Sequence, residues 1–446
     1  MVTDMSKVYD SDVPDTDNGA YLYRAVFDLA HCRWPDEADL PYIGAARLPE
    51  LGEAVSPTLA RKMRTAAEAR QPLLDLLQRA RTYRRSDYHV VMDRSSVLGG
   101  TLYSDVFQTM RTLKFLCLNE QVNGTPAGAL DTCDALLDIG LSFRDEPDLA
   151  TSSIRALAMW SAADMANSAL SRTEPAATDL LRLRDKMLEA ADAFDLQKNL
   201  EVEIVLNVAD AFMIHQYLAR EAYRREQEAV LNQYVRLAFS EAVRETLGSG
   251  ESTPAETSIS TRALKLERRG LWAAQIHGAI CPGAHRRELA DRIRDLLFLY
   301  DQAQLPSEKF AAEVNRAFAD QGESKPEQAI ALVTLRWVLR AKTHTSVAAT
   351  ALSVEAYRAR HGRWPERLAD VQPAPPADPF SGDEMIYKAT PKGRLVYSIG
   401  ENQRDDLGER DANTDTDDIV FRLLDVRHRN VPAAKTDSRP SSAPSR

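Results

Sequence analysis

Residues 401–418 read ENQRDDLGERDANTDTDD and place eight carboxylates against two arginines, a net charge of −6. Two short segments with alternating hydrophobicity flank this stretch, RLVYSIG at 394–400 and IVFRL at 419–423. Alternation of this kind is typical of strands with one buried face, so the sequence predicts a strand on each side of an acidic loop. Like charges at this density repel one another. We therefore expect either a solvated loop or a loop that holds a cation.

The segment before this loop predicts a long helix followed by a small sheet. The helix begins at Pro326 and ends near His361, because Gly362 suits a left-handed C-cap and the residue before Pro365 avoids helical geometry. Strands are expected at 384–389, 394–399 and 419–424, the first two joined as an antiparallel hairpin. Residues 326–428 are thus predicted to form an α+β module, a long helix with a three-stranded antiparallel sheet.

The preceding residues predict a mainly α-helical domain over 19–325. Helices with apolar positions at helical spacing follow one another through short turns, for example where Asn123-Gly124 ends one helix and Thr125-Pro126 opens the next. Short connections make neighbouring helices antiparallel. We expect a repeat-like array of antiparallel helical hairpins, similar in architecture to tetratricopeptide arrays. The terminal segments 1–18 and 429–446 are expected to be disordered.

Composition limits the possible partners. The 446-residue chain carries a net charge of −10 with a pI near 5.5, which argues against nucleic acid or an anionic membrane as its main partner. No apolar run is long enough to span a bilayer, and the polar N-terminus does not resemble a signal peptide. We therefore expect a soluble chain whose partners are proteins.

The sequence contains no recognisable catalytic motif. There is no GxSxG, no HExxH and no phosphate-binding glycine loop, so we expect a protein that is not an enzyme. A hydrolase whose active site lies in the helical domain without a known motif is a less favoured alternative. The four cysteines, at positions 32, 117, 133 and 281, form no CxxC pair and are expected to be buried thiols.

An ordered set of residues over about 80 positions resembles the soluble domain of the major pseudopilin of bacterial type II secretion. The set comprises EAYRARHGRWP at 355–365, Leu368, Asp378-Pro379-Phe380, Gly382, Tyr387, LVYSIG at 395–400 and DDI at 417–419. The resemblance implies a long helix packed on a small antiparallel sheet, with calcium held in the loop between the last strands. The ligands that it implies are Asp405, Asp417 and Asp418, assisted by Ser398 or nearby backbone carbonyls.

The chain also differs from pseudopilins. The N-terminal half of the pseudopilin helix is an apolar membrane segment, whereas Arg336, Arg340, Lys342 and His344 make this helix too polar for a bilayer. We therefore expect no pilus-like filament formed by the usual route. The chain is more similar to bacterial proteins of unknown function that append a pseudopilin-like module to a helical domain.

These observations predict a non-enzymatic interaction or scaffold protein with a calcium-stabilised C-terminal module. Its partners would be proteins, including secretion or envelope components. We expect the cell envelope or periplasm if a membrane anchor precedes this sequence in the native protein, and the cytoplasm otherwise. The main alternative is a soluble cytoplasmic helical-repeat adaptor whose acidic loop binds no metal.

Overall fold

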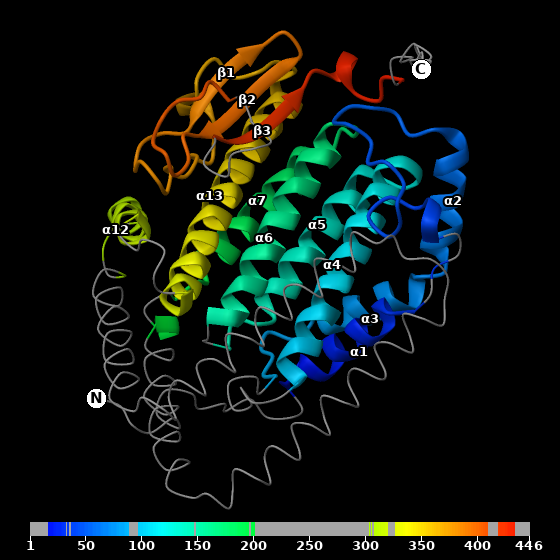
Figure 1. Cartoon of the computed structure of the whole chain (residues 1–446). Coiled ribbons are helices and arrows are strands. Elements are labelled where there is room, and N and C mark those ends of the chain that lie inside the picture. Colours follow the sequence, from blue (N-terminus) through cyan, green and yellow to red (C-terminus); the bar gives the residue numbers. More distant parts are fainter. Residues whose placement is uncertain are drawn as a thin grey trace, which may run out of the picture. The chain divides into compact units, whose positions relative to one another are not determined.

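The computed structural model confirms the predicted fold class, since it is mainly helical with one small three-stranded antiparallel sheet (Figure 1). The chain divides into two compact units, residues 9–199 with 302–446 and residues 1–8 with 200–301. The elements below all belong to the first unit. The structure describes residues 17–32, 34, 37–88, 97–146, 149–195, 198–200, 303, 305, 307–319, 326–408 and 418–432.

Two of the N-terminal helices begin at capping residues that the sequence supplies. The Ser56 and Thr125 hydroxyls accept hydrogen bonds from the first turns of α2 and α5, and a proline occupies the first helical position of each. The elements of this region are α1 (Ala20–Ala30), η3 (Glu37–Asp39), α2 (Pro57–Glu68), α3 (Gln71–Ala80), α4 (Val97–Asn123), α5 (Pro126–Leu141), α6 (Leu149–Leu170) and α7 (Ala177–Asp192).

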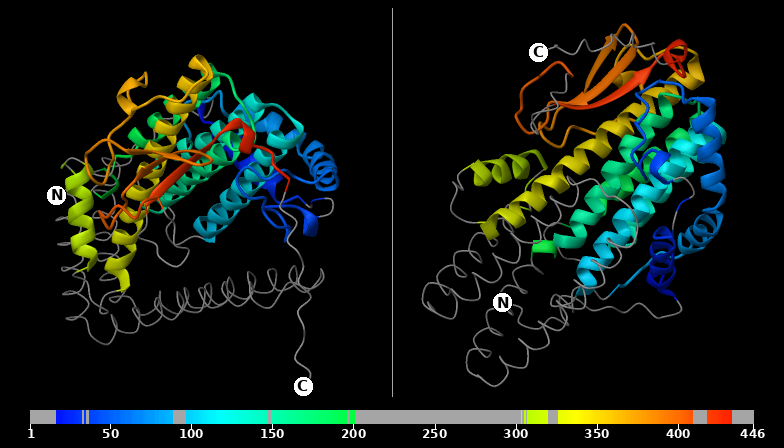
Figure 2. Two further views of the ribbon diagram at one scale, coloured as in Figure 1. Left: turned by 90° about the horizontal axis from the view of Figure 1, so that it is seen from above. Right: turned by 45° about the vertical axis from the view of Figure 1, so that its right-hand side comes forward.

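Helix α13 (Pro326–His361) has the predicted bounds, and Gly362 follows it with a φ of 67°. It packs along both α6 and α7, and its contact with α7 is the most extensive between any two described elements. Helix α5 also contacts α6 and α7, so α5 and α13 occupy opposite corners of a four-helix bundle. Figures 1 and 2 show these helices side by side, with α4 beyond α5.

The position of α13 departs from a linear repeat array. In such an array each hairpin contacts only its neighbours in sequence, whereas α13 closes a bundle with helices that precede it by more than 130 residues. Small buried side chains let these helices approach closely. They include Ala158, Ala162, Ala163 and Ala166 of α6 and Ala348, Ala349, Ala351 and Ala356 of α13.

The polar residues of α13 that argue against a membrane helix take part in this packing. The guanidinium of Arg336 donates to the Glu401 carboxylate, and Arg340 lies 3.6 Å from the same carboxylate. The His344 ring stacks on Trp160 of α6 with 4.8 Å between ring centroids. No helix among the described residues is long and apolar enough to cross a membrane.

The sheet has the order β1-β2-β3, with both pairs antiparallel. Strands β1 (Ile386–Thr390), β2 (Gly393–Ser398) and β3 (Ile419–Leu424) lie within two residues of the predicted bounds. Helix α13 packs on β2 and β3. The remaining described elements are α12 (Ser307–Ala319), η6 (Leu368–Asp370) and η7 (Val426–His428). Of the helical domain predicted over 19–325, residues 201–302 lie outside the described part of the chain.

The predicted C-terminal tail begins too early. Arg429 is buried, and its guanidinium donates to the Glu355 carboxylate at 2.8 Å, to the Thr173 carbonyl at 2.7 Å and to the Leu424 carbonyl at 3.0 Å. Two residues later, the Val431 N–H donates to the Gly52 carbonyl. Residues 429–431 are therefore packed, because one arginine satisfies acceptors from α13, β3 and the α6–α7 connection.

The disordered segment predicted over 1–18 extends too far at its C-terminal end. Asn18, which we expected in a disordered segment, is buried, and its side-chain oxygen accepts hydrogen bonds from the N–H groups of Ala20 and Asp87. Its side-chain amide donates to the Asp87 carbonyl. These bonds join the start of α1 to the segment after α3.

We predict that Arg429→Ala destabilises the protein by about 3 kcal/mol, because it removes one of the two arginines that pair with the buried Glu355 carboxylate and the donor to two carbonyls. The matched control is Arg427→Ala, whose side chain is 73% exposed and lies 3.6 Å from Asp425. Surface pairs of this kind contribute below about 1 kcal/mol. Urea unfolding of both variants measures the difference, and equal losses would contradict the role given to Arg429.

Candidate functional site

The acidic loop connects β2 to β3, as predicted, and the structure describes residues 399–408 and Asp418 of it. At its start, Glu401 is anchored to α13 through Arg336 and Arg340. The Glu401 side chain is 4% exposed, so this pairing holds the first residues of the loop against the helix. Arg336 and Arg340 of α13 therefore hold the β2 end of the loop in place.

Asp405 lies in the middle of the described part of the loop. Its Oδ1 accepts hydrogen bonds from the Tyr397 hydroxyl and from the Leu407 N–H, both at 2.9 Å, and its Oδ2 lies 3.2 Å from Lys388 Nζ. The hydrogen bond from Tyr397 is the main cause that lowers the pKa of Asp405, and the N–H of Leu407 and the Lys388 ammonium add to it. Asp405 is thus ionised and already has a protein cation beside it.

Asp418 lies at the other end of the loop, directly before β3, and is 4% exposed. Its Oδ2 accepts a hydrogen bond from the Gly408 N–H at 2.8 Å. Its Oδ1 is buried and has no hydrogen-bond partner among the described residues. Burial raises the pKa of Asp418, and the charges of Asp406 and Asp405 act in the same direction. Hydrogen bonds from the backbone N–H groups of Gly408 and Asp406 act in the opposite direction, so the buried charge is compensated only in part.

The other two residues of the predicted ligand set differ from Asp418. The Ser398 side chain is buried, and its Oγ accepts a hydrogen bond from the Gly400 N–H at 3.1 Å, so it stabilises the turn after β2. Asp417 lies outside the described residues. Within the part of the chain that is described, no three His, Cys, Asp or Glu side chains are grouped closely enough to hold a metal.

The residues of the loop fit a cation in part. Asp418 supplies a buried oxygen without a partner, and Asp406 lies near enough to raise its pKa. Asp405 faces Lys388 instead. Asp406 therefore lies close to Asp418, and sequence reasoning did not single it out. The sequence offers one indication of Asp406, which is that it directly follows the predicted ligand Asp405.

The tip of the loop presents an apolar side chain to solvent. Leu407 is 64% exposed, more than any other large apolar side chain that the structure describes. Its backbone has a φ of 65°, a conformation that residues other than glycine rarely adopt. The hydrogen bond from its N–H to Asp405 holds this conformation. Strained backbone that its surroundings maintain is common at binding sites.

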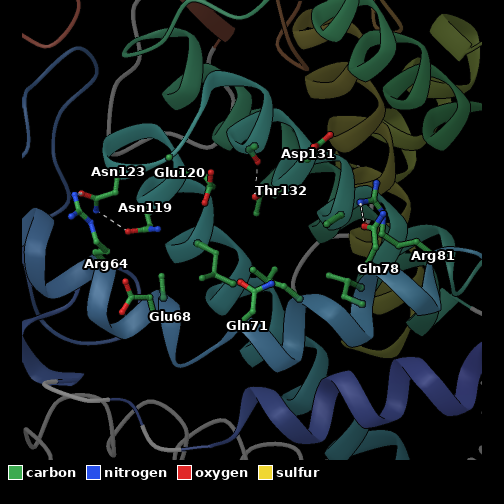
Figure 3. Close-up of a pocket in the computed structure, with 17 residues that line it drawn as sticks. Arg64, Glu68, Gln71, Gln78, Arg81, Asn119, Glu120, Asn123, Asp131 and Thr132 are labelled. Atoms are coloured by element: carbon green, nitrogen blue, oxygen red, sulfur yellow. Dashed lines mark hydrogen bonds between the residues drawn. The ribbon is translucent and has the colours of Figure 1, made fainter.

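A second candidate site lies in the helical part, between α2–α3 and α4–α5 (Figure 3). It is a pocket of about 360 Å³ with an apolar floor that includes Leu74, Leu77 and Leu116. The polar side chains around it are Arg64, Glu68, Gln71, Gln78, Arg81, Asn119, Glu120, Asn123, Asp131 and Thr132. None of the described lining residues is a serine, cysteine, histidine or lysine.

A buried charge cluster closes one end of this pocket. Arg81 of α3 lies 2.6 Å from Asp134 and 2.5 Å from Asp138, both on α5, and Lys186 of α7 pairs with the same two carboxylates. Burial raises the pKa of Asp134, while Lys186 and Arg81 lower it. The cluster joins three helices. Sequence reasoning missed it, although the spacing of Asp134 and Asp138 places both carboxylates on one helical face.

Comparison of the chain with protein-family models, with curated proteins and with solved structures gave no match. The resemblance to the major pseudopilin therefore stays a prediction.

The raised pKa of Asp418 predicts a pH dependence without added metal. A carboxyl with a raised pKa in the folded protein favours the protonated form, so its contribution to stability is present at low pH and is lost as the pH rises through that pKa. We expect Asp418→Asn to be more stable than the wild type near about pH 7 in chelator, and this advantage to shrink as the pH falls toward about 4, the ordinary pKa of an aspartate. Urea unfolding at both pH values measures it. An advantage that does not change with pH would contradict the prediction.

Proposed function

We propose that the protein is a non-enzymatic interaction protein whose acidic loop is ordered by calcium and presents Leu407 to a partner protein. The observation that carries the proposal is the buried Asp418 oxygen without a described hydrogen-bond partner. Calcium binds six to eight oxygens from carboxylates, amides and carbonyls. Asp418 and Asp406 would contribute carboxylate oxygens, and the predicted ligand Asp417 adjoins Asp418 in sequence.

The ion would act on the structure of the loop. A divalent cation would offset the charge of Asp418 and its repulsion from Asp406, and would thereby hold the β3 end of the loop. The β2 end is held by Glu401, and Leu407 lies between these two ends. An ordered loop presents an apolar side chain to a partner at a lower entropic cost than a mobile one.

The composition of the helical pocket supports binding over catalysis. Its described lining offers two arginines and three carboxylates but no serine, cysteine or histidine. We therefore place the partner-binding function on the loop and on the helical surface, and we do not propose a reaction. The envelope and secretion components remain the proposed class of partner.

One observation favours the alternative of an adaptor that binds no metal. Asp405, a predicted ligand, is paired with Lys388 and hydrogen-bonded to Tyr397, so the protein itself neutralises one of the charges in the loop. In that case the loop would keep its conformation in chelator. The two functions differ in whether calcium changes the stability of the protein.

We predict that millimolar calcium raises the melting temperature by roughly 5 °C relative to chelator, because an ion that binds only the folded protein stabilises it. Asp418→Asn and Asp406→Asn should remove most of this shift. The matched control Glu366→Gln, with an 87% exposed side chain outside the loop, should keep it. Thermal unfolding measures all four proteins. No shift in the wild type would sink the calcium proposal and leave the adaptor.

The role of Leu407 has its own test. Leu407→Ser should leave the calcium shift unchanged but reduce cross-linking to partner proteins in the native host. Leu48→Ser is the control, because Leu48 is 46% exposed and lies outside the loop. Quantitative mass spectrometry of cross-linked proteins compares the variants. Equal cross-linking of both variants would show that the loop tip is not the docking site.

A further inference from the structure

Two buried cysteines meet between α4 and α5. The Sγ atoms of Cys117 and Cys133 are 3.7 Å apart, which is a contact between two unbonded thiols. Both residues are fully buried. They lie 16 residues apart in sequence, on helices joined by a tight turn at Gly124-Thr125. The expectation of buried thiols holds for these two residues, whereas Cys32 is exposed and Cys281 lies outside the described residues.

The backbones of the two helices are close at this point. The Cys117 thiol lies 3.4 Å from the Ala129 carbonyl oxygen, so its sulfur contacts the main chain of α5 itself. Ala129 and Cys133 are one helical turn apart and present small side chains to α4. A disulfide requires Cα atoms within about 7 Å of each other and an S–S bond of about 2 Å. The two sulfurs lie 3.7 Å apart, so they must approach each other by about 1.7 Å for the bond to form.

The surroundings make the thiols unreactive once the protein has folded. The side-chain amide of Gln121 donates to Cys117 Sγ at 3.4 Å, and Gln121 is itself held by Ser168 and Arg172. Burial raises the pKa of the Cys133 thiol, which disfavours the thiolate that disulfide exchange needs. A bond between these sulfurs would therefore form while the α4–α5 hairpin assembles, and the folded protein would then protect it from reductants.

We propose that Cys117 and Cys133 form an intramolecular disulfide that fastens α4 to α5 when the chain folds in the presence of a small-molecule disulfide. One cysteine thiolate attacks the small disulfide, forms a mixed disulfide and releases one small thiol. The second cysteine thiolate then attacks the protein sulfur of the mixed disulfide, which forms the Sγ–Sγ bond and releases the second small thiol. Both cysteines are oxidised, and the small disulfide is reduced to two thiols.

This inference does not depend on the proposed calcium site, because α4 and α5 lie in the helical part and the acidic loop follows β2. It also bears on the compartment of the protein. Structural disulfides persist in the periplasm and are rare in the cytosol. A stable pair would therefore fit the proposed envelope location.

The test is to refold the reduced, unfolded full-length chain with a mixture of reduced and oxidised glutathione. After folding, the product is denatured, alkylated and digested. We expect an intact mass about 2 Da below that of the reduced chain before alkylation, and a link between Cys117 and Cys133 in the digest. Cys32→Ser should give the same link, whereas Cys117→Ser and Cys133→Ser should not. If those two variants fail to fold, the peptide map of the wild type still decides.

The oxidised protein should also unfold at a temperature roughly 5 °C above the reduced one, because the bond restricts the unfolded chain. Full alkylation of Cys117 and Cys133 after refolding would overturn the proposal. So would glutathione adducts on them without a cross-link, or a link that pairs either one with Cys32 or Cys281.

Discussion

The buried pair of Glu355 and Arg429 joins the parts of this structure. Glu355 lies on α13 and is 1% exposed, and Arg429 reaches it from beyond β3 while donating to carbonyls on β3 and on the α6–α7 connection. A buried ion pair is stable only if its remaining polar atoms are satisfied, and here Arg358 and the carbonyls complete the set. Arg429 therefore ties the end of β3 to α13, and Arg336 and Arg340 hold the start of the acidic loop against the same helix.

Local signals in the sequence determine much of this fold. Pro326 and Gly362 predicted the bounds of α13, and alternating apolar residues predicted the three strands. Both signals depend only on residues that are near one another in sequence. The closure of the bundle by α13 was not predictable in this way. It depends on small side chains, such as Ala158 and Ala349, that only contact one another once helices distant in sequence meet. Arg429 was assigned to a tail for the same reason, since its partners lie 74 and 256 residues away.

The candidate site was likewise predictable from the sequence only in part. The density of charged residues identified the acidic loop. It did not indicate which carboxylates lie beside a protein cation and which are buried without one. Asp405 lies beside Lys388 of β1 because β1 and β2 pair in a register that places Lys388 opposite Leu395. Asp418 is buried because it lies directly before β3, where its side chain accepts a hydrogen bond from the Gly408 N–H. The Cys117–Cys133 contact likewise depends on the rotation of α4 and α5 about their axes, which residue types and spacing do not specify.

The central claim is that α13 makes the bundle and the sheet one cooperative unit. Native-state hydrogen exchange across a range of low urea concentrations measures this directly, because it gives the opening free energy of each amide. Amides in α6, α13, β2 and β3 should share one opening free energy, equal to that of global unfolding. If the β2 and β3 amides opened at a clearly lower free energy while those of α6 and α13 stayed protected, the sheet would be a separate unit and the claim would be wrong.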